Sequence, residues 1–188
     1  MEVGDMIQLG ELAEIVSGSN IVRLSESQQD RKYTTADFEH DFYTMKLANP
    51  QNAIIYQQSS SMPHMSATIL SDANKEKVIS QIFAIIRIDV SRLNPWYLCY
   101  LLNQSQEVAH KCSQCLQGSV IVRLSAQLMK SVRIPLPDMT VQQNIGELYA
   151  TALYQNHLEI MQANRKLTGI LAVLRKKIEQ KKEIINHE

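Results

Sequence analysis

The chain has 188 residues, of which 45% are apolar and 20% charged, a composition typical of a soluble globular protein with one ordinary domain and an appendage. Its formal net charge is zero, so the composition does not indicate nucleic-acid binding. No apolar run approaches the roughly 18 residues of a membrane span, and no basic-then-apolar leader opens the chain. A cytoplasmic protein that does not enter the membrane is therefore expected.

The N-terminal half predicts short strands separated by polar turns. Apolar clusters rich in β-branched residues predict strands at residues 6–9, 12–16, 52–56, 67–70 and 78–88. A Ser-Gly-Ser-Asn turn ends the second strand, and residues 57–64 form a loop of mostly amide and hydroxyl side chains. Residues 23–41 are polar and irregular, so a loop or a peripheral turn is expected there.

The next stretch predicts short helices and one strand. Asn94-Pro95 is a helix start with proline at its first position, and a second helical piece is expected at residues 125–130. Residues 132–134 form an apolar strand that Pro135 and Pro137 stop, because proline lacks the N–H that a ladder or a helix uses. The expected fold is α+β, a mixed β-rich domain over residues 1–139.

Residues 140–188 predict one long helix. Thr140 and Gln143 have the spacing of a capping box, and the residues after them contain no proline and only two glycines. A helix over residues 141–185 would be roughly 68 Å long at about 1.5 Å per residue. No small domain needs a helix of that length for its own core.

The second half of this helix carries apolar residues at alternating spacings of four and three, which is typical of a coiled-coil seam. We call these positions the seam: Ile160, Asn164, Leu167, Leu171, Leu174, Ile178, Lys181 and Ile185. An earlier stripe, Val141, Ile145, Leu148 and Ala152, stands one residue out of that register. This shift predicts that the first turns pack on the chain's own domain and the later turns on another helix. The alternative is an amphipathic helix folded back on its own core.

Two weaker patterns suggest metal or catalytic chemistry. His110, Cys112 and Cys115 resemble part of a zinc site, but no second ligand pair stands at finger-like spacing, and cysteines also serve as small apolar residues. Asn94-Pro95-Trp96-Tyr97 is close to the motif of amino-methyltransferases, yet its second proline and a glycine-rich cofactor loop are missing. Neither a metal, a cofactor nor a catalytic set is predicted.

Several segments in order resemble half of the DNA-specificity subunit of type I restriction–modification enzymes. They are residues 9–18, 78–87, 94–98, 117–125, 134–137 and 142–145, the last three reading QGSVIVRLS, IPLP and QQNI. Together with the long helix they span nearly the whole chain. The loop after Tyr56 departs from the family, because it carries neither the glycine nor the basic residues expected there.

The resemblance implies a target recognition domain joined to one spacer helix, as in a half subunit without catalytic activity. Its implied partners are double-stranded DNA, the methyltransferase subunit and, through that subunit, the restriction subunit. Because the apolar seam must be covered, a homodimer of antiparallel helices is also predicted. An alternative is an interaction protein of the same fold that binds the methyltransferase or a longer specificity subunit without reading DNA.

Base contacts are expected from polar loop side chains, because amides, hydroxyls and arginine suit base edges. The predicted DNA-binding residues are Asn20, Arg23, Gln57, Gln58, Ser59, Gln117 and Ser119. With no surplus of cations to contact phosphates, binding by the chain alone is expected to be weak.

Overall fold

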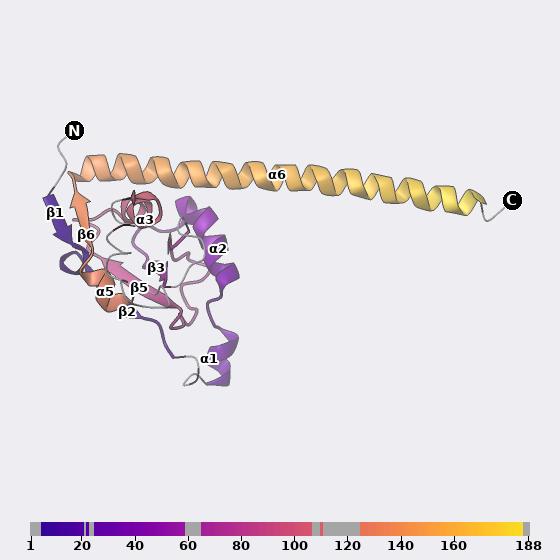
Figure 1. The fold of residues 1–188 in the computed structure, drawn as a ribbon. Helices are drawn as coiled ribbons and strands as arrows, with labels where there is room; N and C mark the ends of the chain where they lie inside the picture. The colour runs from indigo at the N-terminus through magenta and orange to yellow at the C-terminus, as the bar shows by residue number, and fades with distance from the viewer. Residues whose placement is uncertain are drawn as a thin grey trace.

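The computed structural model describes residues 5–20, 22, 25–58, 65–106, 110 and 125–185, with side chains up to residue 180. Within these ranges no helix is both long and apolar enough to cross a membrane. The chain forms an α+β domain from which a single helix extends far beyond the rest of the molecule (Figure 1). The predicted fold class is confirmed.

The centre of the domain is an antiparallel sheet in the order β2-β5-β3-β4. Its strands are β2 (Ala13–Ser17), β5 (Phe83–Ile88), β3 (Ile54–Gln57) and β4 (Ala67–Ile69). One isoleucine from each strand lies in a row across the sheet: Ile15 beside Ile86, then Ile54, then Ile69. All four side chains are buried in the main core, so this row fixes the register of the strands.

Helix α3 (Pro95–Gln104) lies between this sheet and the long helix α6 (Met139–Ile185), as Figure 1 shows. Its predicted start is confirmed, because the Asn94 side chain accepts a hydrogen bond from the Tyr97 N–H at 3.0 Å. Leu98, Cys99 and Leu101 of α3 are buried together with the isoleucine row and with Ala150 of α6. The core is thus a stack of sheet, α3 and the first turns of α6.

The two chain ends of the domain meet in a second, smaller sheet. Strand β1 (Asp5–Gln8) pairs antiparallel with β6 (Arg133–Leu136), which leads directly into α6. The prediction that Pro135 stops this strand is wrong, since Pro135 pairs with Met6 inside it. A two-stranded sheet has only edge strands, and an edge strand tolerates a residue without an N–H. The 3-10 turn η1 (Leu9–Glu11) follows β1, and the predicted helix at 125–130 is α5 (Ala126–Lys130).

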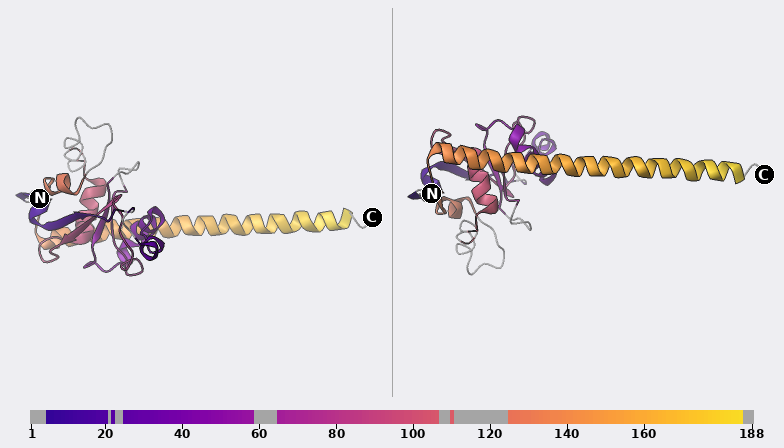
Figure 2. Two further views of the ribbon diagram at one scale, coloured as in Figure 1. Left: turned by 90° about the horizontal axis from the view of Figure 1, so that it is seen from below. Right: turned by 90° about the horizontal axis from the view of Figure 1, so that it is seen from above.

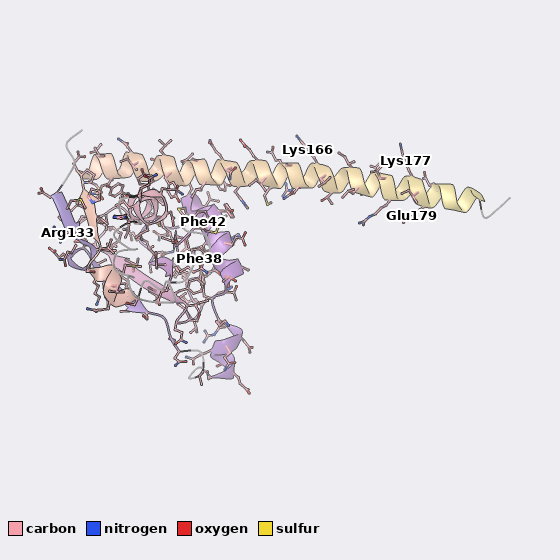
Figure 3. All side chains as sticks on the ribbon, in the orientation of Figure 1. Phe38, Phe42, Arg133, Lys166, Lys177 and Glu179 are labelled. Carbon is pink, nitrogen blue, oxygen red and sulfur yellow. The ribbon has the colours of Figure 1, made fainter. Side chains whose placement is uncertain are left out.

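Residues 23–41 differ from the predicted loop, because they include α1 (Glu26–Asp30) and most of α2 (Thr35–Thr44). Both helices begin at capping boxes, Ser25 with Gln28 and Thr34 with Asp37. Phe38 and Phe42, one helical turn apart, anchor α2 in the interior of the domain, as Figure 3 shows. A further turn, η3 (Met45–Leu47), follows α2.

The strand predicted over residues 78–88 is also shorter than expected. Only Phe83–Ile88 is strand, while Val78 and Ser80 make isolated bridges to Lys32 and Ser19. The Phe83 N–H donates to the Ser80 carbonyl, so the chain turns just before β5 begins. The apolar side chains of Ile79 and Phe83 enter a second small core with Phe38 instead of continuing the ladder.

Helix α6 begins earlier than the predicted capping box. Its first residue is Met139, and the carboxylate of Asp138 accepts a hydrogen bond from the Val141 N–H at 3.0 Å. Thr140 lies inside the first turn, so its predicted role as the cap is wrong. Asp138 is better suited, because a carboxylate at a helix N-terminus also interacts favourably with the helix dipole.

The first turns of α6 pack on the domain as predicted, and Ile145 of the predicted stripe is half-buried against the core, but the rest of the covered face differs from that stripe. Leu148 is 72% exposed and Ala152 is exposed, whereas Gln142, Gly146 and Ala150 are buried. Gly146, Ala150, Leu153 and His157 follow the four-three spacing that continues into the seam at Ile160, so the predicted register shift does not apply from Gly146 onward. Gln142 stands four residues before Gly146 and lies outside that spacing. A search for apolar residues does not find this face, because two of its buried positions are a hydrogen-bonded glutamine and a glycine.

Residues 158–180 of α6 are all exposed, and the helix extends far beyond the domain, as both views of Figure 2 show. The seam residues Leu167, Leu171, Leu174 and Ile178 are all exposed. The alternative of a helix folded back on its own core is therefore excluded. The α6 helix presents one continuous face, covered by the domain in its first part and uncovered afterwards.

Candidate nucleic-acid interface

Polar side chains gather where β2 and β3 end and β5 begins. Ser17 is the last residue of β2, and Gln57 is the last residue of β3. The N–H of Gln58 donates to the Ile82 carbonyl at 3.0 Å, and its Nε2 donates to Ser17 Oγ at 3.3 Å. This end of the sheet presents amides and hydroxyls, the groups that hydrogen-bond to base edges.

The turn after β2 is held tightly against the segment before β5. The Ser19 N–H donates to the Ile79 carbonyl at 2.8 Å, and the Ser19 carbonyl accepts from the Gln81 N–H at 2.9 Å. A Cβ on Gly18 would lie 2.3 Å from the Ser80 carbonyl oxygen, so a side chain there would force the two segments apart. Glycine at this position therefore keeps Ser19 and the exposed Asn20 at the polar end of the sheet.

The structure describes three of the seven predicted DNA-binding residues. Asn20 is exposed, and its Oδ1 accepts from the Val22 N–H at 3.0 Å. Gln57 is half-buried, while Gln58 is only 3% exposed and contacts the sheet with its amide. Arg23, Ser59, Gln117 and Ser119 lie outside the described residues. DNA contact stays a prediction for all seven, although the sheet brings Gln57 and Gln58 to the same end as the turn that carries Asn20.

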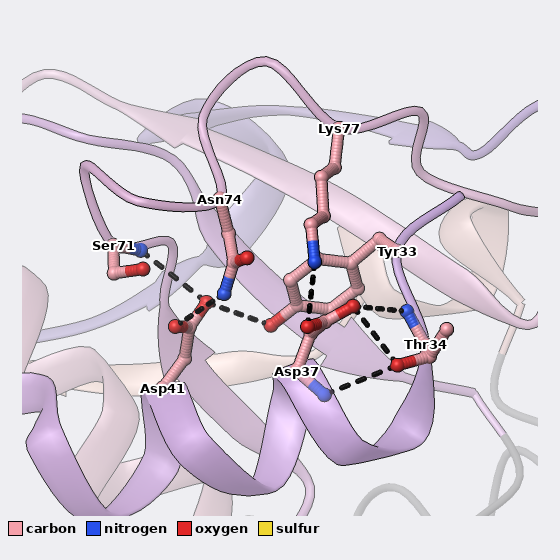
Figure 4. Close-up of polar contacts among 7 residues, drawn as sticks. All are labelled: Tyr33, Thr34, Asp37, Asp41, Ser71, Asn74 and Lys77. Atoms are coloured by element: carbon pink, nitrogen blue, oxygen red, sulfur yellow. Dashed lines mark hydrogen bonds and ion pairs between the residues drawn. The ribbon is translucent and has the colours of Figure 1, made fainter. Parts of the chain in front are cut away.

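A buried carboxylate ties α2 to the segment after β4, and sequence reasoning missed it (Figure 4). Asp41 is fully buried and accepts hydrogen bonds from Tyr33 Oη at 2.9 Å, from Asn74 Nδ2 at 2.8 Å and from the Ser71 N–H at 3.3 Å. Three donors compensate the loss of water around one charge. Burial, reinforced by the charge of Asp41, raises the pKa of Tyr33, which keeps that hydroxyl a donor.

Asp37, one turn earlier on α2, makes the neighbouring contact in Figure 4. Its carboxylate accepts from Lys77 Nζ at 2.7 Å and from the N–H and the hydroxyl of Thr34, both at 2.9 Å. Partial burial acts to raise the pKa of Asp37, but the hydrogen bonds from Lys77 and Thr34 outweigh it and hold the pKa below its usual value. Segment 71–77 is thus fastened to α2 at two points.

Gln142 joins three elements where α6 begins. Its Oε1 accepts from the Asn94 N–H at 2.9 Å, and its Nε2 donates to the carbonyls of Pro137 at 2.9 Å and Arg92 at 3.2 Å. One turn later the backbone of α6 approaches α3 so closely that a Cβ on Gly146 would lie 2.6 Å from the Tyr97 nitrogen. We call Gln142, Gly146 and the start of α3 the root of the helix. The QQNI segment marked this place in the sequence without revealing its contacts.

Asn103 of α3 binds the edge of β4 that pairs with no strand. Its Oδ1 accepts from the N–H groups of Ser66 and Ala67, and its Nδ2 donates to the Ala67 carbonyl, all at 2.8 Å. The side-chain amide thus replaces the strand that β4 lacks at the sheet edge. A polar residue at the end of an apolar helical run was the available signal for such a role.

The weaker sequence patterns receive structural explanations where they are described. Asn94 caps α3 and is mostly buried, and Cys99 is fully buried in the core, where burial raises the pKa of its thiol. Cys112 and Cys115 lie outside the described residues. Among the residues that are described, no group of three or more His, Cys, Asp or Glu side chains could hold a metal ion.

The uncovered part of α6 is apolar over more than the seam. Leu171 and Leu174 are 45% and 49% exposed, and Ile170 and Val173, which are not seam positions, are 59% and 55% exposed. Ile170 and Val173 line an open apolar groove with Lys166, Gly169 and Leu174. Lys166 and Lys177 project from the side of α6 that is turned away from the domain (Figure 3). We call this groove, which shares Leu174 with the seam, the second face.

Two solved structures are similar in fold, each at 17% identity and a TM-score of 0.53. One is the HsdS subunit from Thermoanaerobacter tengcongensis, and the match covers 86% of this chain and 40% of that subunit. The other comes from a structure on complex assembly and conformational transition of the type I R-M system, with 44% of that chain and 89% of this one covered. The chain therefore spans less than half the length of these relatives.

No curated protein matches the chain. The family model described as the type I restriction modification DNA specificity domain matches residues 2–168, which include the whole domain and the first 30 residues of α6. These residues contain the polar end of the sheet, the root of the helix and the beginning of the seam. The chain belongs to the family of type I restriction–modification DNA specificity domains.

Proposed function

We propose that the chain is a sequence-reading DNA subunit of a type I restriction–modification enzyme. Its domain, residues 1–139, reads one half-site, and its helix, residues 140–188, holds two such domains apart and docks the methyltransferase. The chain itself catalyses no reaction and acts in the cytoplasm. The observation that carries this proposal is the family match over 2–168, combined with a domain packed on one end of a helix whose apolar face continues without cover.

The polar end of the four-stranded sheet is the surface that we assign to DNA. It combines the exposed Asn20 with the amides of Gln57 and Gln81 and the hydroxyl of Ser19, on elements that the sheet and Gly18 hold in place. Direct readout requires donors and acceptors presented on a rigid support. Since Gln58 contacts Ser17, we assign it to shaping this surface and leave base contact to its neighbours.

The occupant of the seam that fits best is the seam of a second copy, antiparallel to the first. In each chain the domain covers the same face of α6 up to His157, so a parallel partner helix would collide with it. An antiparallel partner can lie along positions 160–185 and end where the domain begins. That overlap of 26 residues is about 39 Å long, and each leucine it buries contributes on the order of 1.5–3 kcal/mol.

The second face provides a docking surface for the methyltransferase. A single partner helix on the seam covers a narrow stripe, so Ile170 and Val173 would stay exposed in a homodimer. Lys166 and Lys177 beside them favour a partner with an apolar strip bordered by acidic residues. Through this subunit the restriction subunit would join the complex.

Methylation mapping tests the function directly. The chain and its methyltransferase are expressed in a host that lacks both, and the methylated sites are compared with those made by the methyltransferase alone. Two inverted half-sites separated by unread bases are expected, because a two-fold axis relates the two domains. Methylation that is absent, or that does not depend on the chain, would reject the proposal.

A heptad insertion tests the spacer role. Seven residues added after Leu171 keep the seam in phase and lengthen α6 by about 10.5 Å, which is roughly three base pairs at about 3.4 Å each. The gap should widen by that amount while both half-sites stay the same. A four-residue insertion is the matched control, since it puts the seam out of phase and should weaken the dimer.

Docking on the second face can be tested separately. A Cβ added at Gly169 would have nothing within 4 Å, so an arginine fits there without strain and its side chain fills the groove. In a pull-down with the methyltransferase, Gly169→Arg should therefore abolish capture. Met161→Arg, on the same helix outside the groove, is the control that should still bind. Equal capture of both variants would place the methyltransferase elsewhere.

A second candidate function is an interaction protein of this fold that does not read DNA. DNA binding needs cations that contact phosphates. In this domain the side chains of four basic residues already pair with carboxylates, which favours the second candidate: Lys46, Lys75, Lys77 and Arg87. Titration of a random DNA library at two salt concentrations, with and without the methyltransferase, separates the two. Sequence-selective binding in the complex supports the first, and its absence in both conditions supports the second.

A further inference from the structure

A second contact between the domain and α6, beyond the root, lies where the helix leaves the domain. We define the buttress as Tyr43, Met45 and Lys46 together with the α6 residues they approach, Glu147, Thr151 and His157. The ring of Tyr43 stacks on His157 at 5.1 Å between centroids and 14° between planes. Lys46 Nζ donates to Thr151 Oγ1 and lies 3.8 Å from the Glu147 carboxylate.

The buttress is connected to the rest of the domain on both sides. Trp96 Nε1 donates to the Met45 carbonyl at 3.1 Å, which links η3 to the start of α3 and hence to the root. On the other side, α2 is fastened by Asp41 and Asp37 to segment 71–77. Helix α2 therefore connects the body of the recognition domain to a point on α6 that is 15 residues, about 22 Å, beyond Gln142.

From these contacts we infer that the buttress, with Tyr43 and Lys46 as positioning residues, sets the gap between the two half-sites. The inference rests on the proposed function and adds a determinant of specificity to it. The packing of Tyr149 and Ala150 on the core lies nearer to the root than the ring stack on His157 does. Without the buttress, the far end of the contact would be free and the domain could rock about Gln142 in the plane of Figure 1. Rocking carries the end of the domain that lies away from α6 parallel to the helix, the direction in which the half-sites are separated.

The expected size of the effect follows from the geometry. An opening of about 1 Å at a distance of about 22 Å from the root is a rotation of about 3°. A domain of this length is about 35 Å across, so its far end moves by about 1.6 Å. Two domains related by a two-fold axis move by about 3 Å in total, close to the rise of about 3.4 Å per base pair. A small loss of contact therefore corresponds to one base pair of gap.

Removing the buttress should change the gap between the half-sites while the domain stays folded. The ion pair of Lys46 with Glu147 is partly open to water, Tyr43 is only half-buried, and the root keeps its hydrogen bonds. A variant without the buttress should consequently fold, dimerise and recognise the same bases. Changed spacing with unchanged half-sites distinguishes a positioning role from a general loss of structure.

The experiment maps methylated sites for the wild type and for the double variant Tyr43→Ala, Lys46→Ala in complex with the methyltransferase. We expect a single gap for the wild type and two or more neighbouring gap lengths for the variant, with identical half-sites. Tyr43→Phe keeps the ring stack and should retain the single gap. Glu14→Ala is the matched control, because it removes an exposed ion pair, with Arg87, that does not involve α6.

A single unchanged gap in the double variant overturns the inference and leaves the proposed function intact. A wild-type chain that yields no inverted half-sites overturns the proposed function itself, and the inference falls with it. A second measurement applies even if the double variant supports no methylation. Spin labels at Lys75 and Glu159, introduced as an unnatural amino acid and diluted with unlabelled protein, should show a broader distance distribution in the variant. An unchanged distribution would also overturn the inference.

Discussion

The same face of α6 runs along two parts of the helix. The domain covers it in the first part, and it is open to solvent in the second. From Gln142 to His157 the face is covered by the chain's own domain, with Gly146 allowing close approach and Gln142 supplying hydrogen bonds. From Ile160 onward the same face is exposed and carries mainly large aliphatic residues. The comparison shows that an intramolecular contact can use polar and small side chains shaped to one neighbour, whereas the uncovered part has the regular apolar spacing that suits another helix.

The largest expected effect comes from removing the apolar character of the uncovered part. Leu171→Lys combined with Leu174→Lys places two charges on the seam and should convert the dimer into a monomer, because about 3–6 kcal/mol of burial is lost. Light scattering at tens of micromolar measures this change. Leu148→Lys, on the outward side of the covered part, should leave the dimer intact. A wild type that is monomeric without the methyltransferase would contradict the homodimer.

The two glycines of α6 should respond to alanine with opposite signs. Gly146→Ala puts a Cβ 2.6 Å from the Tyr97 nitrogen and 2.8 Å from Asn94 Oδ1, so it should destabilise the protein by about 1–3 kcal/mol. Gly169→Ala meets nothing within 4 Å and should stabilise the helix by up to about 1 kcal/mol. Thermal unfolding followed by circular dichroism compares them. Equal effects would mean that α6 does not approach α3 as described.

Replacing Gln142 tests the hydrogen bonds that hold the root together. Gln142→Leu leaves the Asn94 N–H and the carbonyls of Arg92 and Pro137 without their partner, at a cost of about 1–3 kcal/mol. Gln143→Leu, on the exposed side of the same turn, should change the free energy of unfolding by about 0.5 kcal/mol or less. Chemical denaturation gives both values, and a Gln142 variant as stable as the Gln143 variant would refute the role assigned to it.

The smallest expected effect concerns pH. The pKa of Asp37 is lower in the folded protein than its ordinary value of 3.8, so the unfolded chain binds the proton more readily. The stabilisation from Asp37 is therefore complete above that ordinary pKa and is lost as the pH falls through the folded pKa. Asp37→Asn should flatten the acid side of a plot of melting temperature against pH. Asp30→Asn, an exposed aspartate on α1, is the control.

The uncovered half of α6 and the capped start of α3 were accessible to sequence reasoning because their signals are local. Heptad spacing over residues 160–178, the Asn94-Pro95 start and the absence of proline after Pro137 each depend on residues a few positions apart. The order of short strands was also recognisable, although β5 is shorter than predicted and β6 continues through Pro135. The helices in residues 23–41 were missed because short helices with two anchoring phenylalanines have weak periodicity.

Contacts between distant segments were decided only by the tertiary structure. Asp41 with Asn74, Asn103 with Ala67, Gln142 with Asn94 and Lys46 with Thr151 join residues 33 to 105 positions apart. Each is a polar group that folding brings to a partner, and no spacing in the chain identifies that partner. The sequence by itself determined that α6 is long and has an apolar face. The packing of the domain decided where that face becomes free, because a buried surface exists only once its covering element is in place.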